Sequence, residues 1–225
     1  MNNKTITPKI EAIIFDMDGL IFDSERVVKR SWDFAGKCLG LGPIGSQHIH
    51  HTLGFNVVRR EQYFKGVFGK DFPMDKFNQI ARKEFHKIAD TEGIGMKRGI
   101  KELLIYAKEH RIKTAVATSS RREHSTALLR SADIWDYFDG AVFGDMVTVA
   151  KPDPEIYLKA AASIGVNPKN CIALEDSPAG ILSSHAANMR PVMIPDLVEP
   201  TEEISRLCWR QCESLLEIIP LLECL

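Results

Sequence analysis

Pairs of polar residues follow three short apolar runs of this sequence, at the points where the runs end. The pairs are Asp16 and Asp18, Thr118 and Ser119, and Glu175 and Asp176, and Lys151 follows a fourth run by a few residues. Carboxylates gathered with one ammonium group are costly to hold together unless they share a ligand. A hard cation with a phosphate ester would be such a ligand, because Mg²⁺ takes oxygen ligands and leaves positions for phosphate oxygens.

The two leading acids can divide the chemistry of phosphate transfer between them. Asp16 comes first after its apolar run and is the candidate nucleophile, since a carboxylate can attack phosphorus and form an aspartyl-phosphate. Asp18 could protonate the leaving alkoxide and then deprotonate the attacking water. Gly19 permits the tight turn that would bring both carboxylates over the edge of the sheet. The ammonium of Lys151 suits a phosphate oxygen.

The elements that must position these groups are strands and helices in alternation. Continuously apolar stretches predict strands at 12–15, 114–117, 141–143, 171–174 and 191–194. Such strands favour a parallel sheet covered on both faces. From about residue 94 onward strand and helix patterns repeat, which predicts a doubly wound α/β fold. Ligands of such sheets bind beyond the carboxyl ends of the strands.

Helix starts and stops can be identified from capping residues. Three signals predict helix starts, and two residues predict helix ends. The starts are a capping box from Ser120 to Glu123, with the helix running toward Ser131, and the pairs Asp153-Pro154 and Ser177-Pro178; the ends are Gly165 and Asn188.

A block without strands separates the first run from the rest. From 22 to 92 three helical patterns follow one another, broken at 40–43 and 69–73. We therefore expect a Rossmann-like core formed by 1–21 and 93–225, with 22–92 inserted as a helical cap. One face of the first cap helix is expected to carry Val27, Val28, Ser31, Phe34, Ala35 and Cys38, and the cap core is expected to contain Phe64, Phe68, Phe77 and Phe85.

Composition excludes several function classes. The chain of 225 residues has 29 basic and 30 acidic residues, a net charge of −1. This near-neutral balance disfavours a nucleic-acid partner, and no apolar run approaches the length of a membrane span. Five scattered cysteines argue against a disulfide framework. With no N-terminal targeting pattern, the expected location is the cytoplasm.

Four motifs, in order, resemble those of the haloacid dehalogenase superfamily. They are Asp16-Met17-Asp18-Gly19, Thr118-Ser119, Lys151-Pro152-Asp153-Pro154 and the stretch 174–181. The resemblance extends from about residue 10 to 195, and each motif stands at the end of an expected strand. The helical insert resembles that of the branch containing sugar-phosphate phosphatases and β-phosphoglucomutase.

The resemblance implies a role for each matching residue. Asp16 would be the nucleophile and Asp18 the general acid/base. Thr118 and Lys151, with Ser119 beside them, would hold the phosphoryl group. Mg²⁺ would be surrounded by Asp16, the Asp18 carbonyl, Glu175 and Asp176. The implied activity is Mg²⁺-dependent hydrolysis of small phosphorylated metabolites, in particular sugar phosphates, through an aspartyl-phosphate. The expected partner is a small phosphate ester, and the expected state is a monomer or weak dimer.

Three alternatives stay open. A mutase of the β-phosphoglucomutase type would use the same core, but the cap histidine of that enzyme is replaced by Val28. Phosphonate cleavage would need a buried cap lysine, for which Lys29 and Lys37 are the candidates. A phosphate-binding protein without turnover is a further alternative, although we would then expect one of the site residues to be altered.

Other polar residues have less specific interpretations. His48 and His51 have a spacing that could hold a metal ion, but no carboxylate accompanies them closely. Arg59 and Arg60 are expected on a solvated helix face, and at most one of them could face the site. Arg121 and Arg122 are expected near the phosphate. The tail from 201 to 225 is expected to form a closing helix on the sheet.

Overall fold

A six-stranded parallel sheet forms the centre of the computed structural model, which describes residues 9–224. Its strand order is β3-β2-β1-β4-β5-β6, so the chain starts in the middle and winds outward in both directions. This confirms the expected doubly wound α/β class. The strands are β1 Ala12–Phe15, β2 Lys113–Thr118, β3 Gly140–Phe143, β4 Cys171–Glu175, β5 Arg190–Met193 and β6 Arg210–Gln211.

The central strands are buried on both faces: every position of β1 and β4 is buried, and β1 is apolar throughout. Ile13 and Phe15 pack in one cluster with helices α5 (Ile100–Glu109), α6 (Arg122–Ser131) and α10 (Ile218–Glu223). Ala12 and Ile14 point the other way, toward α7 (Glu155–Ser163). Alanines dominate this second face, which allows the α7 backbone to approach the sheet closely.

The helix caps confirm most of the sequence signals. Ser177 Oγ accepts from Gly180 N at 3.1 Å and starts α8 (Pro178–Ala186), and Asn188 has a φ of 61°. Asp153 Oδ1 accepts from Glu155 N at 2.9 Å, where α7 begins. The capping box predicted from Ser120 is wrong: α6 begins at Arg122 with no side-chain cap. The Ser120 hydroxyl instead bonds to an acid of the site.

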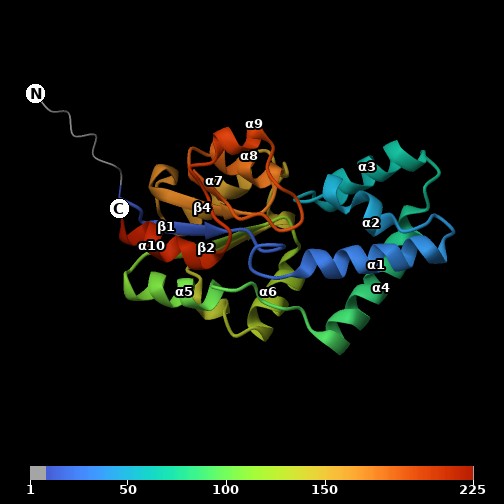
Figure 1. The fold of residues 1–225 in the computed structure, drawn as a ribbon, viewed down its shortest axis with the longest axis horizontal. Coiled ribbons are helices and arrows are strands. Elements are labelled where there is room, and N and C mark those ends of the chain that lie inside the picture. Colours follow the sequence, from blue (N-terminus) through green and yellow to red (C-terminus); the bar gives the residue numbers. More distant parts are fainter. Residues whose placement is uncertain (1–8, 225) are drawn as a thin grey trace, which may run out of the picture.

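Four helices occupy the chain between β1 and α5. They are α1 (Ser24–Cys38), α2 (Ile44–His48), α3 (Val57–Phe68) and α4 (Met74–Glu92). Figure 1 shows them grouped on one side of the sheet, beyond the end toward which β1 points. Their own core is aromatic: the Phe64 ring lies 5.3 Å from that of Trp32 and 5.4 Å from that of Phe77.

Two residues of the expected α1 face are not part of this core. Phe34 is 43% exposed and Cys38 is also exposed. The buried indole is that of Trp32 instead, which packs against Phe64 of α3 and Phe77 of α4.

The chain enters and leaves this helical block through two adjacent segments. Phe22 and Met96 form an antiparallel bridge. Asp23 N donates to Gly95 O at 2.9 Å, and Lys97 N donates to Ile21 O at 2.8 Å. Residues 24–94 are therefore joined to the sheet by a paired linker.

The tail differs from the single helix expected. It forms two short helices, α9 (Glu202–Leu207) and α10, with strand β6 between them. The edge of β5 explains this difference, because its carbonyl groups can bind a further strand. Trp209 N donates to Pro191 O and Cys212 N donates to Met193 O, so the tail extends the sheet. Single 3₁₀ turns lie at Ile49–His51, Trp135–Tyr137, Gly144–Met146, Pro168–Asn170 and Leu215–Glu217. None of the helices within 9–224 has the length and hydropathy needed to cross a bilayer.

Candidate active site

Three carboxylates meet where β1 and β4 end side by side. Phe15 is paired with Leu174 in the sheet, so the next residue of each strand path, Asp16 and Glu175, lies at the same edge. Asp176 follows directly. One carboxylate oxygen from each acid lies within 4.8 Å of those of the other two, and all three residues are buried. Parallel pairing thus brings together residues that are more than 150 positions apart in sequence.

Lys151 is the cation at the centre of this group. Its Nζ lies 2.5 Å from Asp16 Oδ1, 2.6 Å from Glu175 Oε1 and 3.0 Å from Ala117 O. The side chain is only 1% exposed. All three N–H groups of the ammonium therefore have an acceptor, and its position is fixed from three strands.

Glu175 is fully occupied by neighbouring donors. Oε1 accepts from Lys151 and also from the Tyr157 hydroxyl at 2.5 Å. Oε2 accepts from Ser177 Oγ at 3.0 Å. The carboxylate of Glu175 consequently holds Lys151 in place from below, whereas Asp176 has no side-chain hydrogen bond to a described residue.

The three carboxylates carry more negative charge than the one ammonium of Lys151 can neutralise. Burial raises the pKa of Asp16 to about 8, with Lys151 opposing the rise and Glu175 and Asp18 adding to it. Burial also raises the pKa of Asp176 well above its usual range. Burial lowers the pKa of Lys151, but the charges of Asp16 and Glu175 outweigh it and raise the pKa. Three acids facing one ammonium would be stabilised by a further cation.

The main chain makes room for the acids at one glycine. Gly19 has a φ of 86°, and a Cβ there would lie 2.1 Å from Asp176 Oδ2. Only glycine fits this close approach at a left-handed φ.

Asp18 is held apart from the three carboxylates. Ser24 Oγ donates to its Oδ1 at 2.7 Å, and Ser120 Oγ donates to its Oδ2 at 2.6 Å. Thr118 Oγ1 lies 3.4 Å from the same Oδ2. Ser119 turns the other way and donates to Gly54 O in the helical block at 3.1 Å.

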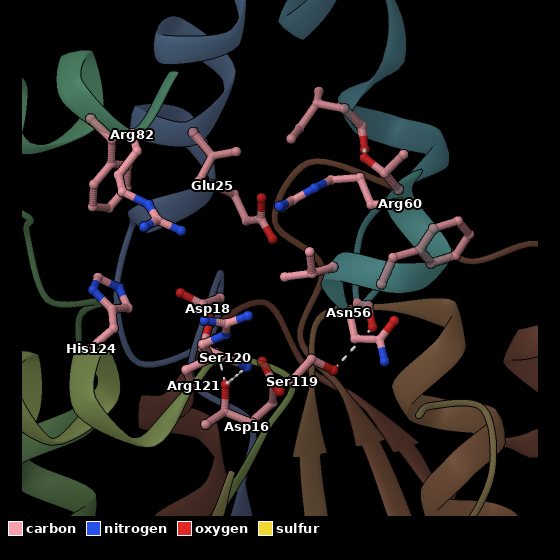
Figure 2. A pocket seen from close by; sticks show the side chains of 18 of the residues that line it. Asp16, Asp18, Glu25, Asn56, Arg60, Arg82, Ser119, Ser120, Arg121 and His124 are labelled. Atoms are coloured by element: carbon pink, nitrogen blue, oxygen red, sulfur yellow. Dashed lines mark hydrogen bonds between the residues drawn. The ribbon is translucent and has the colours of Figure 1, made fainter. Parts of the chain in front are cut away.

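A cavity of about 640 Å³ separates this sheet edge from the helical block. Asp16, Asp18 and Asp176 lie on its floor, with Thr118 and Ser119. Lys151 and Glu175 are not part of the lining and lie beneath it. Figure 2 shows the acids of the floor facing side chains that come from the helical block.

Several lining residues were missed by the sequence reasoning. They are Glu25 on α1, Asn56 at the start of α3, Arg82 and Phe85 on α4, and His124 on α6. Burial, with the charges of Asp18 and Asp16, raises the pKa of Glu25 to about 8, and Arg60 opposes the rise. Glu25 and Val28 are both cavity residues and stand one helical turn apart, which is the sequence signal that could have found Glu25.

Two expectations for the helical block are corrected. Phe85 is not in the cap core: it lines the cavity, and its ring lies 5.7 Å from that of His124. Arg59 and Arg60 are not on a solvated face. Arg60 lines the cavity, and Arg59 Nη1 donates to Lys151 O at 2.9 Å, so only one of the pair faces the site, as expected.

The two histidines whose spacing could hold a metal ion contact Tyr63 instead. His48 Nδ1 lies 3.0 Å from the Tyr63 hydroxyl, and the His51 ring stacks on the Tyr63 ring at 5.9 Å. Among the residues that the structure describes, the carboxylates of Asp16, Glu175 and Asp176 form the one group of three close candidate ligands.

Comparison with known proteins identifies relatives over nearly the whole chain. The model of the family described as haloacid dehalogenase-like hydrolase matches residues 13–194. Hexitol phosphatase B of Escherichia coli is 30% identical over 84% of this chain and 86% of its own length. A phosphorylated carbohydrates phosphatase of Thermotoga maritima is 31% identical over 81% and 84%. The crystal structure of β-phosphoglucomutase from Clostridium difficile superposes with a TM-score of 0.79 at 25% identity, covering 95% of this chain and 96% of that one.

Proposed function

We propose that this chain, which belongs to the haloacid dehalogenase-like hydrolase family, hydrolyses phosphate monoesters of small sugars or sugar alcohols through an aspartyl-phosphate on Asp16. The observation that carries the proposal is the place of Asp16, on the cavity floor and in contact with the buried ammonium of Lys151. The names of two relatives, a hexitol phosphatase and a phosphorylated carbohydrates phosphatase, support the substrate class.

In this proposal Asp16 attacks phosphorus with its free oxygen, Oδ2. The other oxygen is held by Lys151, whose charge offsets the charge that develops on the transferred group. The hydroxyl of Thr118 and the main-chain N–H groups after β2 complete the cradle. Ser119 would contribute to this cradle through its main-chain N–H, since its side chain donates a hydrogen bond to Gly54 O.

Asp18 is the proposed general acid and base. Two serine hydroxyls fix the orientation of its carboxylate, which faces the cavity beside Asp16 (Figure 2). In the first step it gives a proton to the leaving alkoxide, and in the second it takes one from the attacking water.

The carboxylates fit a divalent cation, and we propose Mg²⁺. Asp16 would offer Oδ1, the oxygen that does not attack phosphorus, and Asp176 has carboxylate oxygens without a hydrogen-bond partner among the described residues. The Asp18 carbonyl would add a third ligand, and Glu175 would act mainly by holding Lys151. When bound, Mg²⁺ would neutralise the excess of negative charge and orient phosphate oxygens.

We infer that 22–92 is a cap domain on a core of 1–21 and 93–225. The cavity lies between the two, and the paired linker at Phe22 and Met96 gives the cap a place to rotate. Closing over substrate would exclude bulk water. Because all five cysteines are free thiols, we propose that the enzyme works in the cytoplasm. We also propose that it is a monomer or weak dimer.

A mutase is the second candidate, favoured by the structural match to β-phosphoglucomutase. It would return the phosphoryl group to sugar instead of water. The cavity residue Val28 stands against it, because a valine cannot take part in proton transfer near Asp18.

A ³¹P NMR time course distinguishes these reactions in one tube. With Mg²⁺ and a mixture of sugar 1- and 6-phosphates, we expect inorganic phosphate to grow, excess chelator to stop its growth and added Mg²⁺ to restore it. Asp16→Asn should abolish turnover, and Asp71→Asn, an exposed control in the α3–α4 loop, should not. Interconversion of esters without free phosphate would establish the mutase, and metal-independent turnover would contradict the assigned acids.

A further inference from the structure

The loop that follows β5, residues 195–199, extends from the sheet to the helical block. Leu197 and Val198 pack against the aromatic core of that block. Asp196 precedes them in the loop, and its side chain is only 4% exposed. This loop therefore connects the sheet to the helical block in addition to the paired linker.

Asp196 has two cationic partners, and both of them also pair with Asp23. Asp196 Oδ1 lies 2.7 Å from Lys97 Nζ and 3.2 Å from Arg26 Nη2. Asp23 Oδ1 lies 3.4 Å from Lys97 Nζ and 3.0 Å from Arg26 Nε. Asp23 and Lys97 stand on the two linker segments, and Arg26 stands in the first turn of α1. Through these ion pairs the loop holds both linker segments and the start of α1.

The burial of Asp196 distinguishes these contacts from ordinary surface ion pairs. Exposed pairs contribute little, because water and salt screen them. The Asp196 carboxylate is almost without contact to water, and its Oδ2 has no hydrogen-bond partner among the described residues. Its charge therefore depends on Lys97 and Arg26, which favours one fixed arrangement of the linker.

The first turn of α1 also contacts the proposed general acid. Ser24 Oγ donates to Asp18 Oδ1 at 2.7 Å, and Ser24 is buried. The next residue, Glu25, points into the cavity above Asp18 (Figure 2). Arg26, which pairs with Asp196, belongs to the same turn. A displacement of this turn would therefore move the Ser24 hydroxyl away from Asp18.

We propose that Asp196 is a positioning residue: through Arg26 and Lys97 it fixes the first turn of α1 and thereby the carboxylate of Asp18. This inference rests on the proposed function, because it takes Asp18 as the general acid. It predicts a loss that is specific to substrates whose leaving group must be protonated. A residue that only stabilised the fold would lower activity toward every substrate alike.

Asp196→Ala removes the contacts of this residue. The protein should still fold, because both cations keep Asp23 as a partner in a region open to water. Glu202→Ala on α9 is the matched control, since Glu202 is 89% exposed and pairs with Arg206 one helical turn away. If Asp196→Ala does not fold, Asp196→Asn, which keeps the shape of the side chain, replaces it.

Hydrogen exchange followed by NMR examines the linker without any substrate. The amides of Asp23 and Lys97 donate to Gly95 O and Ile21 O across the linker. Both should exchange about fivefold or more faster in Asp196→Ala than in the wild-type protein, and at the wild-type rate in the control. Unchanged exchange of these two amides in Asp196→Ala would overturn the proposal.

The ratio of two kcat/KM values tests the connection to Asp18. Acetyl phosphate needs no acid, because acetate leaves as an anion, whereas the alkoxide of a sugar phosphate must be protonated. The second substrate is sorbitol 6-phosphate or glucose 6-phosphate, whichever the wild-type enzyme hydrolyses faster. Relative to acetyl phosphate, kcat/KM for this ester should fall about tenfold in Asp196→Ala. Ser24→Ala should cause the same selective loss, and the double variant should lose little more, since both changes act through one contact.

Equal losses with both kinds of substrate, or no loss with either, would overturn the proposal. Faster exchange at the linker in a protein that hydrolyses none of these esters would support the connection between Asp196 and the linker and contradict the proposed function. The inference and the proposed function can therefore fail separately.

Discussion

Removing the ammonium of Lys151 should destabilise the protein far more than removing a surface lysine. Lys151→Met keeps most of the volume but leaves Asp16 and Glu175 as buried, unpaired carboxylates. Breaking a buried pair from one side costs about 3–5 kcal/mol. In a chain of this length that corresponds to about 6–20 °C in Tm. Urea unfolding followed by far-UV circular dichroism, with chelator present, measures the loss.

Lys159→Met is the matched control, because Lys159 is 47% exposed and pairs with Glu155 one helical turn away. Its Tm should fall by about 2 °C or less. The double variant Lys151→Met with Glu175→Gln should be less destabilised than the sum of its single variants, by about 1 kcal/mol or more, since the second change removes one stranded charge. A loss as small as that of the control, or strict additivity, would refute this reasoning.

If Lys151→Met does not fold, Tyr157→Phe tests the same network more gently. The Tyr157 hydroxyl donates to Glu175 in the buried group. Its removal should cost about 1.5–3 kcal/mol, the value of a hydrogen bond to a charged acceptor. An unchanged urea midpoint would show that Glu175 does not depend on these donors.

Two further substitutions and one thiol reaction have defined outcomes. Gly19→Ala should lower both Tm and kcat, because the added methyl would collide with the Asp176 carboxylate at a left-handed φ; thermal unfolding and phosphate release measure the two effects. Ser120→Ala should lower kcat about tenfold with little change in Tm, since Asp18 loses one of its two serine donors; steady-state kinetics measures it. Cys171 is fully buried and burial raises its pKa to about 12, so at pH 8 it should react with a disulfide reagent far more slowly than the exposed thiols; the absorbance of the released reagent measures this.

Each of these has an internal control. Gly66→Ala on exposed α3 meets nothing within 4 Å and should not destabilise. Ser131→Ala removes only a bond to Leu128 O and should leave kcat unchanged. The exposed thiols of Cys38 and Cys224 should react within the first minutes at pH 8. Fast reaction of all five thiols, or kinetic parity between the two serine variants, would contradict the burial and the contacts described.

Sequence alone could predict the sheet and its acidic edge because both follow from local patterns. Buried strands are apolar, and polar residues follow where each strand ends. Parallel pairing then brings these strand ends together, as at Asp16 and Glu175. The cap signal of Ser177 was correct for the same reason, since its partner, Gly180 N, is three residues away.

The errors arose where a distant partner competed with a local one. Ser120 has the spacing of a helix cap, yet Asp18 lies 102 positions away in sequence and takes its hydroxyl. Phe85 has the periodicity of a core residue, but its place beside His124 depends on how the helical block lies over the sheet. The same holds for Arg60, whose surroundings come from α1 and α4. No pattern within one helix carries that information.

The paired linker at Phe22 and Met96 has a consequence for how such enzymes can diversify. The chain leaves the sheet and returns to it at almost one point, so the helical block is connected to the sheet in the same way as a single long loop. Another block of different length could be spliced in at this junction without altering the register of any central strand. Acids, ammonium and sheet edge would be inherited intact, while the cavity residues that the helical block supplies, such as Glu25 and Arg60, would be replaced together. In this architecture chemistry and selectivity can therefore be exchanged as separate parts.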